Sequence, residues 1–127
     1  MTNTLVDKDI LINFLRGKRK AKDFLSMLLD DSNISCSAIA VAEIAAGMRA
    51  AEEERTKALQ DQIEVLAVTR DVAEKAGSYK RSIRGHSLEL DDCLVAATAF
   101  VHRAELATGN GKHYPTKDIK VTVVDTD

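Results

Sequence analysis

The chain has 127 residues, of which 45% are hydrophobic and 30% are charged, and its formal net charge is −2. This length can bury a real core but is too short for two ordinary domains, so we expect residues 1–127 to form a single domain. The sequence has no run of about 18 apolar residues and no secretory signal pattern, so we expect a cytoplasmic protein without a membrane span. The negative charge disfavours a protein that grips nucleic acid through a broad basic surface, although clustered carboxylates around a divalent cation would also lower the formal charge.

The spacing of apolar residues divides the chain into ten segments. Short apolar runs predict strands, and apolar residues three and four positions apart predict helices. In chain order we expect strand 4–7, helix 10–15, helix 19–30, strand 33–36, helix 38–51, strand 65–68, helix 70–85, helix 88–103, strand 105–108 and strand 121–124. Strands that alternate with helices predict an α/β fold of three layers, in which helices flank a central, mostly parallel sheet of four to five strands.

Several local features refine this prediction. Ser37 and Thr69 precede apolar helical stretches and are expected to cap the two helices. Gly47 is expected to bend the first of these helices only slightly. The strongly charged stretch 52–57 is interpreted as solvated surface without chemistry.

The two cysteines, Cys36 and Cys93, both lie inside apolar stretches without metal-ligand spacing. We therefore expect two buried thiols and no disulfide.

Four polar residues occur at or just after predicted strand ends or in the first turns of the following helices. They are Asp7, Glu43, Asp92 and Asn110. Ligands of open parallel sheets bind outside the carboxyl ends of the strands, and the predicted topology can bring all four residues to that edge.

Each acid also has a plainer interpretation. An Asp between a strand and a helix is often only an N-cap, and for Asp7, with Asp9 as the competing cap, this is about as probable as a functional role. Glu43 interrupts an apolar run and is therefore expected to be partly buried, where a carboxylate needs a partner. Asp92 directly precedes another apolar run, whereas Asp91, one step round the helix, can point to solvent, so we prefer Asp92.

Three carboxylates in one concave site repel each other unless a cation neutralises them. Hard oxygen ligands without Cys or His at zinc spacing suit magnesium or manganese. The acids therefore predict a divalent-metal site.

Four segments resemble the motifs of the PIN-domain ribonucleases, and in particular the VapC toxins of toxin–antitoxin pairs. The first is Leu5-Val6-Asp7-Lys8-Asp9 with its Leu-Arg-Gly ending at 15–17, and the other three are residues 37–47, 88–99 and 106–114. The resemblance covers nearly the whole chain. Four motifs in the right order are much more specific than any one of them.

The resemblance implies an endoribonuclease that uses Mg²⁺ or Mn²⁺, forms a homodimer and is blocked by a small antitoxin. Asp7 and Asp92 would hold the metal, and Glu43 would be a further ligand or the base that orients the attacking water. Thr108 and Asn110 would position water or phosphate.

Two positions depart from the family pattern. Lys8 stands where the family usually has Thr or Ser, and its cation could occupy part of the metal site or approach the phosphate. The fourth motif offers Asn110 and His113 rather than an acid, which favours one metal over two. His113 is interpreted either as a packed or surface histidine or as a group that touches phosphate or assists proton transfer.

Basic residues beside the motifs are candidates for RNA contact, although each cluster could also be solvated surface. They are Arg16, Lys18, Arg19, Lys20 and Lys22, with Lys80, Arg81, Arg84 and Lys112 as a second group. The aromatic content of 4% argues against a base-stacking platform, so we expect recognition of the shape and backbone of a structured RNA, with tRNA as one candidate.

Two other functions remain open from the sequence. Asp7-Lys8-Asp9 also fits the Asp-x-Asp of haloacid-dehalogenase-like phosphatases, in which Asp7 would be a nucleophile. A receiver-like or degenerate domain would bind metal or RNA without turnover.

Overall fold

The computed structural model describes residues 2–84 and 88–127. Its strands are β1 (Thr2–Val6), β2 (Ser32–Ser37), β3 (Glu64–Leu66), β4 (Glu105–Thr108) and β5 (Val121–Val123). Its α-helices are α1 (Lys8–Leu15), α2 (Arg19–Asp31), α3 (Ala38–Ala46), α4 (Glu53–Asp61), α5 (Arg70–Ser82) and α6 (Leu90–Val101). Two short 3-10 turns, η1 (Ala50–Glu52) and η2 (Gly111–His113), complete the described elements.

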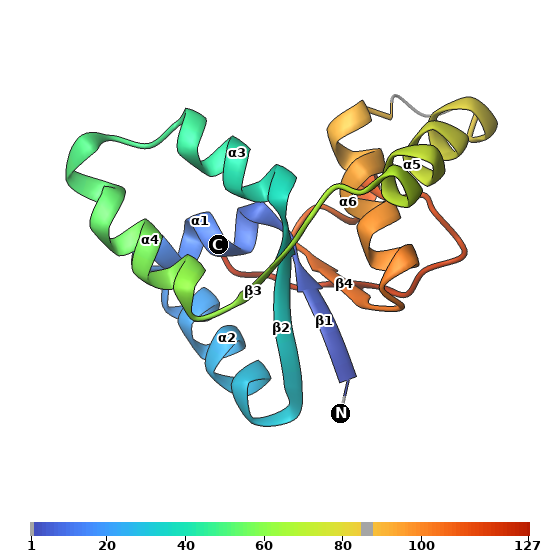
Figure 1. The fold of residues 1–127 in the computed structure, drawn as a ribbon. Helices are drawn as coiled ribbons and strands as arrows, with labels where there is room; N and C mark the ends of the chain where they lie inside the picture. Colours follow the sequence, from blue (N-terminus) through green and yellow to red (C-terminus); the bar gives the residue numbers. More distant parts are fainter. Residues whose placement is uncertain (1, 85–87) are drawn as a thin grey trace.

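The five strands form one sheet in the order β3-β2-β1-β4-β5, and every neighbouring pair is parallel (Figure 1). The central strand β1 pairs with β2 on one side and with β4 on the other, where Val6 lies opposite Ala107. The predicted three-layer α/β fold with a parallel central sheet is confirmed.

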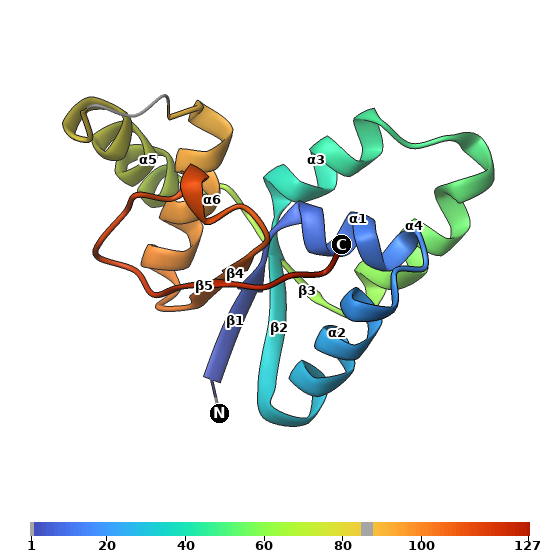
Figure 2. The same cartoon turned by 180° about the vertical axis from the view of Figure 1, so that it is seen from behind.

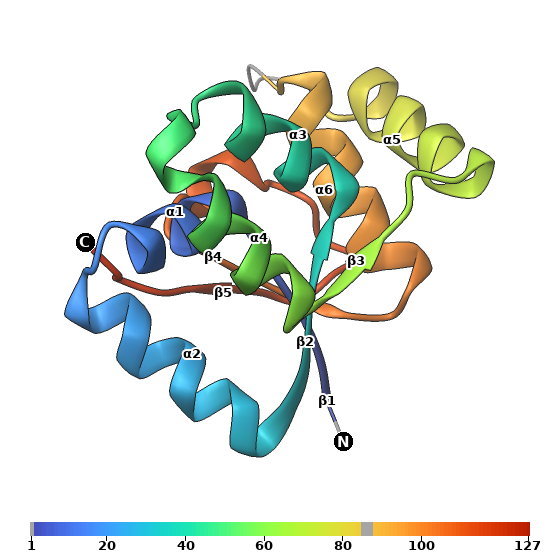
Figure 3. The same cartoon turned by 60° about the vertical axis from the view of Figure 1, so that its left-hand side comes forward.

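Neighbouring side chains of β1 point to opposite faces of the sheet, as the two-residue period of a strand requires. Leu5 packs in a core with residues of α5 and α6, whereas Val6 packs in a second core with residues of α1, α2, α3 and α4. Figures 1 and 2 show the two groups of helices on either side of the strands, and Figure 3 turns the side with α2 and α4 towards the viewer. Burial of both faces explains why the neighbouring residues Leu5 and Val6 are both apolar.

The strand order reverses between β1 and β4. The chain moves from β1 outwards through β2 to β3, and then crosses to β4 and β5 on the other side of β1. The two strands are still joined beyond β1, because the backbone N–H of Asp7 donates to the carbonyl of Ala107 at 2.9 Å. The crevice outside the carboxyl ends at such a reversal is where open α/β sheets bind ligands.

The largest error of the sequence prediction lies between β2 and β3. The helix expected to reach residue 51 ends at Ala46, with Gly47 as its C-cap, because glycine is a poor helix residue and frees the chain to turn. The charged stretch 52–57 is largely exposed, as expected of solvated surface, with Thr56 as its buried exception, but most of it belongs to an unexpected helix, α4, which also buries Leu59. Sparse apolar residues among many charges hid this helix.

Other boundaries differ by a few residues. The third strand is shorter and earlier than 65–68, and α6 is shorter than 88–103. The helix expected to run to Gly85 ends at Ser82, and Gly85 itself lies outside the described residues. Leu29 of α2 is 64% exposed, so not every apolar side chain of this helix faces the core.

The predicted caps and thiols are confirmed. Ser37 accepts a hydrogen bond from the N–H of Ile39, and Thr69 accepts one from the N–H of Val72. Cys36 and Cys93 are free and buried, and burial raises the pKa of Cys36 to about 11. In the described part of the chain, no helix is long and apolar enough to cross a membrane.

Candidate active site

Asp7 lies directly after β1, beyond the carboxyl end of the strand at the reversal, and is only 6% exposed. Its Oδ1 accepts the backbone N–H of Lys8 at 2.8 Å, so the N-cap interpretation is correct. Its Oδ2 accepts the hydroxyls of Thr108 at 2.8 Å and Tyr114 at 2.9 Å. The Asp7 carboxylate therefore caps α1 and also accepts two hydroxyls from the β4 side of the strand reversal. An N-cap alone does not require these two additional donors.

Asp9, considered only as a competing cap, ties α1 to the end of β4. Its Oδ2 accepts the backbone N–H of Gly109 at 2.8 Å and the side-chain amide of Asn110 at 3.3 Å. Burial, followed by the charge of Asp7, raises the pKa of Asp9. The Asp-x-Asp spacing was the sequence signal for this residue, and the structure places Asn110 against Asp9.

Glu43 projects from α3 to the Lys8 ammonium, with which it forms an ion pair. The carboxylate is 24% exposed, so the expected semi-buried position with a partner is confirmed. Burial raises the pKa of Glu43, as does the neighbouring Asp91, while Lys8 opposes the shift. The hydrogen bond from Lys8 to Glu43 in turn raises the pKa of the lysine.

Asp91 and Asp92 occupy the first turn of α6, and both are partly buried. Asp92 faces η2, where its Oδ2 lies 3.5 Å from Nδ1 of His113. Burial, followed by the charge of Asp91, raises the pKa of Asp92. The expectation that Asp91 can point to solvent needs correction, because the helix turns its charge towards Glu43.

Tyr114 is the last residue of the fourth motif, and no role was predicted for it. It is 5% exposed and donates its hydroxyl to Asp7. Burial, followed by the charges of Asp7 and Asp92, raises the pKa of Tyr114 far above the neutral range, so the hydroxyl stays protonated. The aromatic position directly after His113 was the signal that could have found this residue.

The donor set fits a hard divalent cation. No group of three His, Cys, Asp or Glu in residues 2–84 and 88–127 is arranged to hold a metal ion by itself. Magnesium, however, usually takes one or two carboxylates and completes its shell with waters and phosphate oxygens. Asp7 and Asp92 offer that number of carboxylates, and burial, followed by the charge of Asp91, raises the pKa of Asp92, a shift that a bound cation would oppose.

The basic residues expected to contact RNA fall into different places. Lys112 lies in η2 beside His113, and Arg16 lines a cavity of about 220 Å³ together with Glu43. Lys18 and Arg19 are exposed at the start of α2. These four residues are all exposed, whereas Lys20 is ion-paired with the Asp125 carboxylate and Lys80 donates to the Leu88 carbonyl.

We expect Asp92→Asn to raise the melting temperature of the metal-free chain at neutral pH. A pKa raised by folding means that the ionised carboxylate destabilises the folded state. The gain should shrink as the pH falls through the raised pKa of Asp92 and vanish below the ordinary value of 3.8, where the carboxyl is protonated in both states. Thermal melts of both proteins from about pH 3 to about pH 7 test this. A variant that melts no higher than wild type at neutral pH would contradict it.

The fold and the acidic crevice define a doubly wound α/β protein whose site suits a cation and a phosphate. Residues 4–118 match the model of the PIN domain family. Ribonuclease VapC10 of Mycobacterium tuberculosis is 39% identical over 113 residues, which cover 87% of this chain and 85% of the relative. Ribonuclease VapC19 of the same organism is 33% identical over 114 residues, which cover 87% of this chain and 91% of the relative.

Solved structures agree in fold. VapBC2 from Rickettsia felis, bound to a DNA fragment from their promoter, has a TM-score of 0.88 at 17% identity and covers 98% of this chain and 100% of that one. A toxin–antitoxin complex from Klebsiella pneumoniae has a TM-score of 0.78 at 27% identity, with 93% and 99% covered.

The chain belongs to the PIN-domain family and, within it, to the VapC-type ribonucleases. The haloacid-dehalogenase-like alternative is not favoured, because the family match extends through all four motifs.

Proposed function

We propose that the chain is a metal-dependent endoribonuclease of the cytoplasm and the toxin of a toxin–antitoxin pair. The observation that carries the proposal is the buried carboxylate of Asp7 at the strand reversal, held by Thr108 and Tyr114 and facing the second acid, Asp92. Relatives at 39% and 33% identity are named ribonucleases, which supports RNA as the substrate.

In this proposal Asp7 and Asp92 hold Mg²⁺ or Mn²⁺. The ion would lower the pKa of a bound water and stabilise the charge that develops on the phosphate. The hydroxyls of Thr108 and Tyr114 fix the orientation of Asp7, because both donate to the same oxygen. Glu43 is less available as a metal ligand or base than the sequence suggested, because its carboxylate is already ion-paired with Lys8.

Hydrolysis joins the oxygen of a water molecule to phosphorus and breaks the bond from phosphorus to a ribose oxygen. The attacking water loses a proton, and the departing ribose oxygen gains one. In this proposal His113, which is 55% exposed and lies beside Asp92, delivers a proton to the departing oxygen or contacts the phosphate. Asn110, anchored by Asp9, positions the phosphate or water next to it.

The RNA would be held mainly through its phosphates. Lys112 approaches from η2, and Arg16, Lys18 and Arg19 extend the contact along the ends of α1 and α2. Such contacts read the shape and backbone of a structured RNA, such as a tRNA, rather than stacked bases.

A small antitoxin would neutralise the enzyme by covering this crevice, and two copies of the chain would form a homodimer. The solved relatives support the first point, because several of them are toxin–antitoxin complexes.

The test compares wild type with Asp92→Asn on total cellular RNA, with magnesium and with a chelator. We expect wild type to cleave RNA only with magnesium and the variant to lose at least about 100-fold in rate, since the variant removes a charged metal ligand. Because Asp92→Asn is expected to fold more stably than wild type, its loss of activity cannot come from unfolding. Equal cleavage by the two proteins, or cleavage that the chelator does not change, would refute the proposal.

A further inference from the structure

The acids at the crevice separate into two groups with different neighbours. Glu43 on α3 is ion-paired with the Lys8 ammonium, and Asp91, whose charge raises the pKa of Glu43, lies in the first turn of α6, which contacts α3. Asp7 and Asp92 form the other group: His113 lies 3.5 Å from Asp92, and within residues 2–84 and 88–127 no Lys or Arg side chain forms an ion pair with either acid. One group therefore has a full positive charge within it, and the other does not.

The position of Lys8 is unusual for its own helix. It is the first residue of α1, where the positive end of the helix dipole disfavours a cation. Its side chain reaches instead to α3, and the charges of Glu43, Asp91 and Asp7 all act on it. The acids around it, and not a stabilising effect on α1, therefore account for a lysine at this position.

The pair is also only partly buried, with 37% of the Lys8 side chain and 24% of the Glu43 side chain exposed. A purely structural ion pair at this exposure contributes little to stability. The pair, however, joins the first residue of α1 to α3, and α3 contacts both α1 and α6. Figure 1 shows that α1 and α3 follow the carboxyl ends of β1 and β2. The main effect of the Lys8–Glu43 pair is therefore to hold a positive charge beside the site.

We propose that the Lys8 ammonium fills the second cation position of the active site, on Glu43 and Asp91, so that the chain binds a single divalent ion on the side of Asp7 and Asp92. The inference rests on the proposed metal-dependent function and states which cation neutralises which acids of that site. Glu43 then acts as a positioning residue for Lys8 and not as a metal ligand. A lysine in place of a second ion keeps a positive charge near the phosphate at every metal concentration.

The experiment counts Mn²⁺ ions bound per chain by electron paramagnetic resonance of free Mn²⁺, with the full chain and no RNA. We expect one site-bound ion in wild type and two in Lys8→Met. Without the lysine ammonium, the carboxylates of Glu43 and Asp91 are free to bind a second Mn²⁺ ion from solution. Lys8→Thr should also bind two, and it provides a second variant if the methionine disturbs the fold. Thermal melts confirm that the compared proteins are folded.

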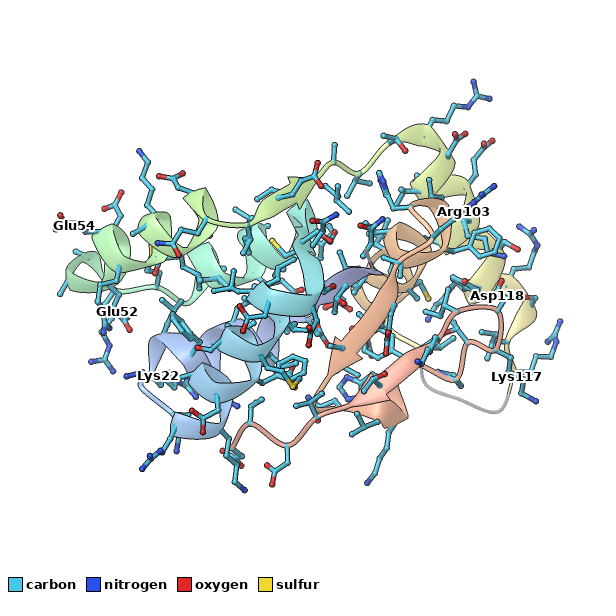
Figure 4. The ribbon with its side chains drawn as sticks, turned by 90° about the horizontal axis from the view of Figure 1, so that it is seen from below. Lys22, Glu52, Glu54, Arg103, Lys117 and Asp118 are labelled. Carbon is cyan, nitrogen blue, oxygen red and sulfur yellow. The ribbon has the colours of Figure 1, made fainter. Side chains whose placement is uncertain are left out.

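Three controls locate the second ion. Lys8→Arg should bind one ion because the positive charge remains. Lys8→Met combined with Glu43→Gln should return to one because a ligand of the second ion is lost. Lys22→Met, which changes an exposed lysine of α2 at the edge of the molecule in Figure 4, should bind one like wild type.

Two site-bound ions in wild type would overturn the inference. A single ion in both Lys8→Met and Lys8→Thr, whatever its affinity, would also overturn it. Failure of the proposed nuclease function gives a different result, since a chain that binds one ion in wild type and two in the Lys8 variants but cuts no RNA would refute the function alone.

Discussion

Asp7→Asn is expected to abolish RNA cleavage and, unlike Asp92→Asn, to destabilise the fold. The Asp7 carboxylate accepts three donors, the N–H of Lys8 and the hydroxyls of Thr108 and Tyr114. An asparagine amide has one oxygen and one NH₂ group, so at least one of these donors would lose its acceptor oxygen. An unsatisfied buried group costs about 1–3 kcal/mol, so we expect a loss of about that size in the free energy of unfolding.

The two consequences of Asp7→Asn are measured separately. Cleavage of a purified RNA should fall by at least about 1000-fold, as expected for a charged group at the reacting centre. Urea unfolding should give the loss of stability. Asp23→Asn makes the same chemical change at an exposed position of α2 and should alter neither quantity. An inactive Asp7→Asn protein with unchanged stability would refute the predicted loss of hydrogen bonds in the fold. An active variant would refute the assignment of Asp7 to the site.

Gly109→Ala is expected to reduce RNA cleavage by about 100-fold, the effect of a misplacement of about 1 Å at a reacting centre. A Cβ atom at Gly109 would overlap the Asp9 carboxylate, to which the Gly109 N–H donates. Asp9 would have to move away, and the side-chain amide of Asn110 would lose its acceptor. The damage should therefore appear in the rate of cleavage more than in the folding of the chain.

Gly77→Ala is the matched control. It lies in α5, and nothing lies within 4 Å of the position that its Cβ would take. Alanine favours a helix over glycine by about 1 kcal/mol, so this variant should be slightly more stable and fully active. Cleavage rates of both variants, measured beside their melting temperatures, test the comparison. A Gly109→Ala protein that cleaves RNA at the wild-type rate would show that Asp9 and Asn110 do not position the substrate.

The order and kind of most elements follow from local patterns in the sequence. The apolar run of β1 and the spacing in α2 and α6 identify strand and helix because each burial pattern is fixed by the geometry of its own segment. Ser37 and Thr69 mark helix starts for the same local reason. The α4 helix was missed because only two of its residues, Thr56 and Leu59, are buried, and their neighbours are charged.

The sequence also identified the candidate acids of the site. Asp7, Glu43 and Asp92 follow strands or lie near the starts of helices in an alternating α/β pattern, and they match three motifs in order. It could not determine their partners. Lys8 meets Glu43 across 35 positions of the chain, Gly109 meets Asp9 across 100, and Tyr114 meets Asp7 across 107.

Only the tertiary structure decides such contacts, because they depend on the order of strands in the sheet and not on the period of any one segment. The placement of β4 beside β1 brings Thr108 and Tyr114 onto Asp7. The meeting of α1 with α3 turns Lys8, a residue that fits poorly at the start of its own helix, into the partner of Glu43. The sequence thus determined the acids and the fold class, and the packing of distant segments decided how their charges are balanced.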